Sequence, residues 1–311
     1  MTGGLLHSPH GAALAAGGEI AADVAANVAG RSLWQDAWRR LRANRAAVVA
    51  LGVLAVIAVA SVIGPYFLPW TYDEIDWEHL EALPPDLALG HYFGTDSLGR
   101  DLLARTLFGG RISLMVGILA TFVALFIGVT VGAVAGFVGG KTDQILMRFV
   151  DLMYSVPLTF FVIILMVLFG RNFILMFLAI GAVEWLTMAR IVRGQTLALR
   201  NKEFIEAARA SGGSTGAIIL RHILPNVLGV VMIYVTLTIP QVILLESFLS
   251  FLGLGVQEPM TSWGMLINEG AAELEINPRT LIIPAAFMTA TLFCFNFLGD
   301  GLRDALDPKD R

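Results

Sequence analysis

Six stretches of the sequence are each long and apolar enough to cross a lipid bilayer as a helix. A bilayer core about 30 Å thick requires about 20 apolar residues, because only a helix satisfies its own backbone hydrogen bonds inside lipid. The predicted spans are residues 46–68, 112–137, 152–170, 172–189, 226–245 and 280–299. The sequence therefore predicts an all-α membrane protein with six transmembrane helices.

The composition excludes an ordinary soluble domain. Hydrophobic residues make up 56% of the chain and charged residues only 15%, and the mean hydropathy is +0.73, whereas soluble domains carry about 25% charged residues. The formal net charge of −4 conceals a strong separation of charge along the chain, so it does not indicate a nucleic-acid partner. The single cysteine, Cys294, excludes intrachain disulfides and any zinc cluster built on cysteines.

Lysine and arginine are distributed unevenly among the loops that join the spans. If the N-terminus lies inside, most of the 21 basic residues fall on the inner side, and the exceptions are Arg100, Arg105, Arg111, Arg171 and Arg279. Because cytoplasmic loops carry the excess of basic residues, this distribution puts both chain ends in the cytoplasm. The two long outer loops, about 69–111 and 253–279, carry mainly acidic charge.

The chain before the first span divides into two parts. Residues 1–30 are rich in glycine and alanine, which favours a disordered cytoplasmic tail or a short alanine-rich helix. Only His7 and His10 have a spacing that a metal could use, and we regard them as a chance pair in this tail. Residues 31–45 predict an amphipathic helix at the membrane surface, in contact with lipid, and residues 46–311 then form the six-helix domain.

The first outer loop contains a candidate helix start. Thr95 or Asp96 is suited to cap a short helix over residues 98–107, and Asp101 is placed to pair with Arg105 one helical turn later. A structural role of this segment and a direct contact with a partner protein both remain open at this point.

The inner loop between the fourth and fifth spans, about residues 194–225, is longer than a simple connection requires. Residues 201–211 predict a helix with Phe204, Ile205 and Ala208 on one side, which Gly212 and Gly213 then end. Ser214 or Thr215 is suited to cap a second helix that continues to Pro225. We therefore expect two short helices on the cytoplasmic face, joined by a glycine turn.

This loop resembles the signature of the permeases of ATP-binding-cassette importers. The signature is Glu-Ala-Ala, three residues, Gly, nine residues, Ile, any residue, Leu-Pro, and the chain departs from it only at His222, which occupies the isoleucine position. A short helix that fits a groove on an ATPase is a means of transmitting movement to the spans. The residues that the resemblance assigns to an ATPase-docking loop are Glu203, Phe204, Glu206, Ala207, Ala208, Gly212, Leu224 and Pro225.

Further strings along the chain are similar to the oligopeptide, dipeptide and nickel branch of these permeases, among them residues 91–96, 247–255 and 299–308. The resemblance implies a type I importer fold in the bacterial inner membrane. It also implies a second homologous permease subunit as heterodimer partner, two ATPase subunits that hold ATP and magnesium, and a periplasmic oligopeptide-binding protein that delivers peptide. The chain itself is expected to bind no cofactor. Dipeptide or nickel remains an alternative substrate.

The chain lacks its own nucleotide-binding loop. Residues 139–142 read Gly-Gly-Lys-Thr, but Ala135 occupies the position where a phosphate-binding loop requires glycine. The histidines lie on different sides of the membrane and form no catalytic set with serine and carboxylate. We therefore expect no enzymatic activity in this chain.

Two acidic residues, Glu184 and Glu246, lie within predicted spans, where ionisable groups usually face a cavity or a partner. For both, lining of a transport pathway and structural pairing remain open, and Arg190 or Arg193 is a candidate partner of Glu184. An ion-coupled secondary transporter would use one of these acids, but no inverted repeat supports that alternative.

Three glycines in the second predicted span, Gly128, Gly132 and Gly136, follow one another at four-residue spacing. We expect them to allow another helix to pack closely against this span.

Overall fold

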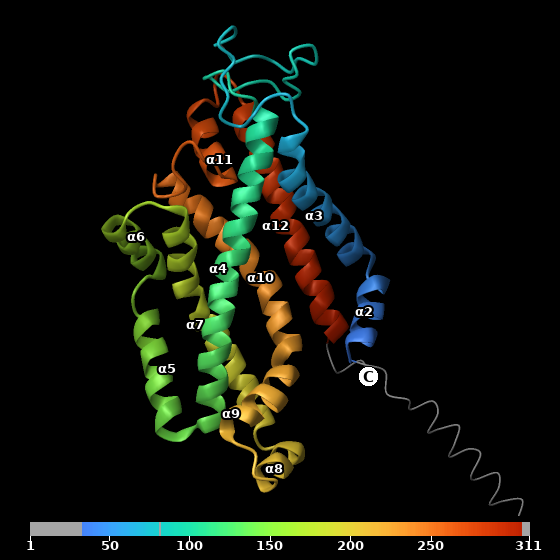
Figure 1. Cartoon of the computed structure of the whole chain (residues 1–311), viewed down its shortest axis with the longest axis vertical. Helices are drawn as coiled ribbons and strands as arrows, with labels where there is room; N and C mark the ends of the chain where they lie inside the picture. The colour runs from blue at the N-terminus through green and yellow to red at the C-terminus, as the bar shows by residue number, and fades with distance from the viewer. Residues whose placement is uncertain (1–32, 81, 307–311) are drawn as a thin grey trace, which may run out of the picture.

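The computed structural model describes residues 33–80 and 82–306, which are mainly helical (Figure 1). Within these ranges there is no strand, only isolated bridges in the outer loop. The first helices are α2 (Leu33–Ala43), α3 (Arg45–Ile63), the 3₁₀ turn η1 (Gly64–Tyr66), α4 (Leu102–Val138), α5 (Gly140–Tyr154), α6 (Leu158–Phe169) and α7 (Phe173–Leu199). They are followed by α8 (Glu203–Ala210), α9 (Thr215–Ile218), the π turn η2 (Ile219–Ile223), α10 (Leu224–Phe251), α11 (Trp263–Ala272) and α12 (Arg279–Leu306). The predicted tail at residues 1–30 lies outside the described residues.

Among the described residues, five helical segments are long and apolar enough to span a membrane, and a bent pair brings the number to six when the pair is counted as one span. The pair consists of α5 and α6, which meet at an angle of 84°. The predicted span over residues 152–170 is therefore not one continuous helix, since it contains the end of α5, the break and α6. Pro157 directly precedes α6, and a proline disfavours helical geometry in the residue before it, which ends α5 at this point.

Helix α4 begins ten residues earlier than the predicted span, so the expected separate helix over residues 98–107 is its first part. The cap is neither Thr95 nor Asp96. Asp101 caps α4 by accepting a hydrogen bond from the Ala104 N–H at 2.7 Å. The predicted pair of Asp101 and Arg105 is also absent from the described ion pairs, because Asp101 hydrogen-bonds His91 instead, at 3.0 Å.

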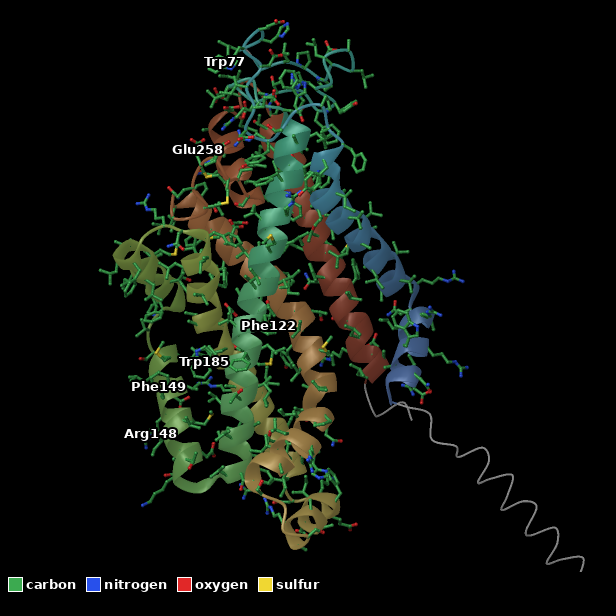
Figure 2. All side chains as sticks on the ribbon, viewed as in Figure 1. Trp77, Phe122, Arg148, Phe149, Trp185 and Glu258 are labelled. Atoms are coloured by element: carbon green, nitrogen blue, oxygen red, sulfur yellow. The ribbon has the colours of Figure 1, made fainter. Side chains whose placement is uncertain are left out.

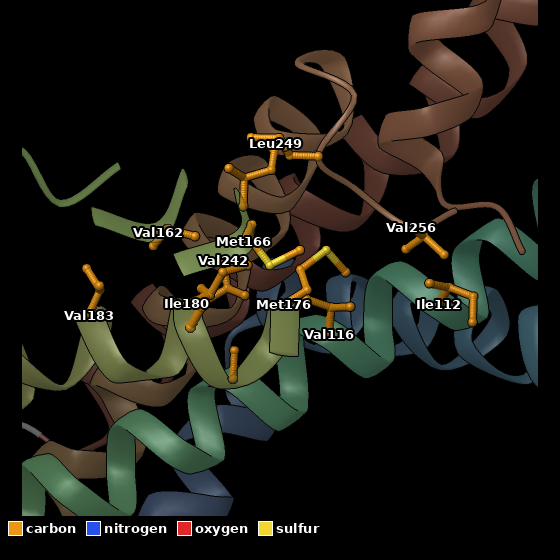
Figure 3. Packing of buried hydrophobic residues seen from close by; sticks show 13 residues of the cluster. Ile112, Val116, Val162, Met166, Met176, Ile180, Val183, Val242, Leu249 and Val256 are labelled. Atoms are coloured by element: carbon orange, nitrogen blue, oxygen red, sulfur yellow. The ribbon is translucent and has the colours of Figure 1, made fainter. Parts of the chain in front are cut away.

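The long helices α4 and α7 pack closely through the glycine series of α4. A Cβ atom added at Gly128 would lie 2.8 Å from the Trp185 carbonyl oxygen, and one at Gly132 would lie 2.5 Å from the Ala189 carbonyl oxygen. The expected packing role of these glycines is thus confirmed. Farther towards the outer end, an apolar cluster that includes Val116, Val162, Met176, Ile180 and Val242 joins α4 and α7 to α6 and α10 (Figure 3).

Ion pairs join the first outer loop to α11. Asp96 accepts from Arg100 at 2.8 Å and also pairs with Arg105, which reaches Glu269 of α11 at 2.9 Å. The Asn277 side-chain amide donates to the Thr95 carbonyl at 3.0 Å. These contacts connect the two outer loops, whose residues Trp77 and Glu258 lie at the end of the molecule opposite to α8 (Figures 1 and 2).

Replacing Arg105 with alanine is expected to destabilise the outer end of the protein by about 3 kcal/mol, because it removes the buried cation between Asp96 and Glu269 and leaves Arg100 as the cation for both carboxylates. Arg105 is only 3% exposed. Burial raises the pKa of Glu269, whereas Arg105 and Arg100 act in the opposite direction. Without Arg105 this pKa should rise further, so on acidification Glu269 should be protonated at a higher pH in the variant than in wild type, and the defect should shrink as the pH falls. Thermal unfolding of wild type and variant across pH measures this effect, and a defect independent of pH would contradict it.

Candidate functional site

Helix α8 lies at the inner end of the molecule, beyond the ends of the long helices (Figure 1). Glu203 and Glu206 occupy its first turn, where negative charge is favoured by the helix dipole. The turn after α8 depends on Gly212, which adopts a φ of +81° that is strained for other residues. Ser214 then caps α9 by accepting from the Ala217 N–H at 3.3 Å.

Two contacts anchor α8 to the membrane helices. Ile205 is fully buried in a cluster with Phe137 of α4, Val192 of α7, and Ile218 and Ile223 from the segment that leads into α10. The guanidinium group of Arg209 lies over the Phe137 ring, at 4.8 Å from its centre. A force applied to α8 is therefore transmitted through packed side chains to three long helices.

The opposite side of α8 faces solvent. Glu203, Glu206 and Ala207 are exposed, and 43% of the Phe204 surface is accessible to solvent. A groove of about 380 Å³ lies beside this surface, between α8 and the following segment, and its lining residues are Phe204, Ala207, Ala208, Ser211, Gly213, Ala217, Ile218, Arg221 and His222. Helix α8 is thus anchored through its buried side, and its exposed side is available as a contact surface.

The second predicted helix of the inner loop is not a separate element on the membrane surface. The segments α9, η2 and α10 form one helical span, Thr215–Phe251, and α7 also continues beyond its predicted end to Leu199. Pro225 lacks an N–H and its ring crowds the carbonyl four residues earlier, which accounts for the wide π turn before it. Leu224 and Pro225 therefore belong to the first turn of α10, and the loop itself is confined to residues 200–214.

Replacing Ile205 with alanine is expected to loosen α8 by about 3 kcal/mol, because the deletion leaves a cavity in a packed cluster. Amide hydrogen exchange of α8 should accelerate, while exchange in α4 should stay unchanged. The matched control is Phe204→Ala on the exposed side of the same helix, which should alter exchange much less. Equal acceleration in both variants would show that Ile205 does not anchor the helix.

Glu246 is enclosed, and its carboxylate accepts hydrogen bonds from three serine hydroxyls. Its carboxylate accepts from Ser262 at 2.7 Å, from Ser250 at 2.8 Å and from Ser113 at 3.3 Å. The Ser113 hydroxyl also accepts from the Trp263 N–H at 3.1 Å. Glu246 of α10 thus links α4 to the start of α11, and this enclosure favours a structural role over lining of the pathway.

Glu184 does not pair with the arginines proposed for it. Arg190 donates to Asp151 at 2.6 Å, and Arg193 donates to Asp143 at 2.5 Å. Glu184 instead lines a cavity between α7 and α10 together with polar side chains that the sequence analysis did not single out, namely Thr187, Tyr234, Thr238 and Gln241. Their positions at three- and four-residue intervals along apolar helices were the available sequence signal.

Within the described part of the chain, no three His, Cys, Asp or Glu side chains form a group that could hold a metal ion. The functional features are therefore a helical contact surface at the inner end and a polar cavity between two spans. These features suit mechanical coupling and the passage of a solute.

Comparison with known proteins places these features in a family. Residues 128–311 match the family described as "Binding-protein-dependent transport system inner membrane component", and residues 32–85 match the "N-terminal TM domain of oligopeptide transport permease C". The chain belongs to the inner membrane components of binding-protein-dependent transport systems. It is thus a multi-pass permease subunit of an ATP-binding-cassette importer, not an enzymatic subunit, and such permeases work with ATPases and a second permease subunit.

Relatives of this permease cover nearly its whole length. It is 61% identical to the oligopeptide transport system permease protein OppC of Escherichia coli over 91% of this chain and 94% of that protein. Identity is 58% with the Haemophilus influenzae protein of the same name, over 91% of this chain and 90% of that one. It is 45% with the dipeptide transport system permease protein DppC of Bacillus subtilis, over 90% of this chain and 87% of that protein.

A solved structure supports the type I importer fold of this permease. A chain of the MetNI methionine ABC transporter in an inward-facing conformation superposes with a TM-score of 0.51 at 19% identity, covering 66% of this chain and 96% of that chain. The predicted fold class is confirmed by this likeness together with the helical spans.

Proposed function

We propose that this permease carries oligopeptides across the inner membrane into the cytoplasm. The observation that carries the proposal is the 61% identity over 91% of the chain to a protein named as an oligopeptide transport permease. We infer as partners a second homologous permease subunit, two ATPases that hold ATP and magnesium, and a periplasmic oligopeptide-binding protein. In this arrangement the chain itself needs no cofactor.

We infer further that α8 and the groove beside it are the surface on which an ATPase docks. The exposed residues Glu203, Phe204, Glu206 and Ala207 supply charge and apolar area to a partner groove, a common mode of helix recognition. The buried Ile205 and the turn at Gly212 keep the helix in a fixed orientation. ATP-driven closure of the ATPases would then move the inner ends of α4, α7 and α10.

A dipeptide is the second candidate substrate, because a relative with 45% identity is named as a dipeptide transport permease. The lower identity ranks it behind longer peptides. Nickel is a third candidate, and it rests only on the similarity of the sequence to the oligopeptide, dipeptide and nickel branch of these permeases.

The test is reconstitution of the complete transporter. The chain is co-expressed with the second permease and the ATPases, purified through a tag on this chain, and placed in liposomes with loaded binding protein. We expect the ATPases to co-purify, hydrolyse ATP in response to loaded binding protein, and drive uptake of labelled tripeptide. Competition by dipeptides, longer peptides and nickel then ranks the substrates. The absence of co-purifying ATPase would contradict the docking role, and uptake inhibited by nickel alone would contradict the peptide function.

A further inference from the structure

A polar cavity lies between α7 and α10 at mid-membrane depth. It measures about 90 Å³ and is lined by Glu184, Thr187, Met188, Tyr234, Leu237, Thr238 and Gln241. Glu184 follows the start of α7 at Phe173 by eleven residues, which corresponds to roughly 17 Å of helix at 1.5 Å per residue. Since the bilayer core is about 30 Å thick, Glu184 lies near its centre.

The polar side chains around this cavity extend to the surface of the chain. Thr187 and Gln241 are exposed, whereas Glu184, Tyr234 and Thr238 are half-buried. Tyr234, Thr238 and Gln241 follow one another at intervals of four and three residues and therefore lie on one face of α10. Exposure of carboxylate and amide groups to lipid at this depth is costly. This face is therefore suited to a water-filled pathway rather than to lipid.

Glu184 differs from the other acid within the spans. Glu246 accepts hydrogen bonds from three serine hydroxyls and is fully enclosed. Among the ion pairs and hydrogen bonds of the described residues, none involves Glu184, and the arginines nearest in sequence are paired with Asp151 and Asp143. A half-buried acid without a protein cation, surrounded by hydroxyl and amide groups, is equipped to bind a cation that passes through.

We propose that Glu184 and its polar neighbours on α10 recognise positively charged side chains of the peptide during translocation. An ammonium or guanidinium group would donate hydrogen bonds to the Glu184 carboxylate, and the hydroxyl and amide oxygens around it would replace part of the lost hydration. Acidic side chains would be repelled at the same point. The proposal rests on the peptide function proposed above and adds a charge preference that belongs to the permease.

The experiment compares uptake of trilysine and triglutamate by the reconstituted transporter, each supplied as saturated binding protein. Because the binding protein is a separate chain, changes in this permease leave its affinities unaltered. The measured quantity is the ratio of the initial uptake rates of trilysine and triglutamate. We expect Glu184→Gln to lower this ratio about tenfold relative to wild type, with ATP hydrolysis retained.

A second variant provides a gain that misfolding cannot imitate. Gln241→Glu adds a carboxylate to the same cavity, so it should raise the ratio several-fold and restore it when combined with Glu184→Gln. The matched control is Gln144→Glu on the exposed surface of α5, away from the cavity, and it should leave the ratio unchanged. An unchanged ratio in Glu184→Gln would overturn the proposal. If that variant loses all uptake, the response of Gln241→Glu decides, and no rise would overturn it. Failure of wild type to take up either peptide, despite intact ATP hydrolysis, would instead refute the peptide function.

Discussion

Glu206→Lys is expected to reduce peptide uptake at least about tenfold, because it reverses a charge at the centre of the proposed ATPase contact. The side chain is exposed on α8, and lysine is a good helix former, so the helix itself should persist. The loss of negative charge from the first turn should cost less than about 1 kcal/mol. Uptake and the amount of co-purifying ATPase should therefore fall together while the protein remains folded in the membrane.

The control for this prediction is the same charge reversal elsewhere on the inner side. Asp304→Lys changes an exposed acid near the end of α12, and we expect uptake and ATPase recovery to stay near the wild-type values. Co-purification of ATPase with the Glu206→Lys variant at the wild-type level, together with normal uptake, would exclude α8 as the docking surface.

Gly132→Leu is expected to destabilise the helix bundle by at least about 3 kcal/mol, because backbone atoms surround the position and cannot move aside. An added Cβ would lie 2.5 Å from the Ala189 carbonyl oxygen and 3.0 Å from the backbone nitrogen of Arg193. Helices α4 and α7 would have to separate over several turns. Thermal unfolding in detergent, followed by tryptophan fluorescence, should show a midpoint lowered by roughly 5–10 °C.

Gly194→Leu is the matched control, since it adds the same side chain to the same helix pair. A Cβ at Gly194 of α7 meets no atom within 4 Å, so this change should leave the midpoint unchanged or raise it slightly, because leucine is the better helix former. If both variants lowered the unfolding midpoint by a similar amount, the effect would come from replacing any glycine in these helices and not from the α4–α7 contact.

The charged residues of the outer loops show why the sequence predicted where a helix begins better than which charged side chains form ion pairs. The i,i+4 rule paired Asp101 with Arg105, but Arg105 instead contacts Asp96 and Glu269, and Asp101 caps α4. Glu269 is 164 positions away in the chain. A pairing rule for one helix contains no information on charges that a distant loop brings to the same place.

The inner loop likewise combines features that the local sequence predicts with features that it does not. Its glycine turn was predictable, because φ preference is a local property. The three residues expected on one side of its first helix do not share one environment, since Ile205 is buried and Phe204 is exposed. The fusion of its second half with α10 was not predictable, because Pro225 at that point favoured a helix start rather than a π turn within one span.

The sequence by itself determined the membrane class, the six spans and the place of the inner loop, because hydrophobic length and the backbone's need for hydrogen bonds act within single segments. Only the tertiary structure decided that Glu246 is enclosed by serines whereas Glu184 faces a cavity. Both are glutamates within apolar helices. Their environments differ because distinct faces of α4, α7, α10 and α11 are packed against them, and packing between remote segments is a property of the folded chain.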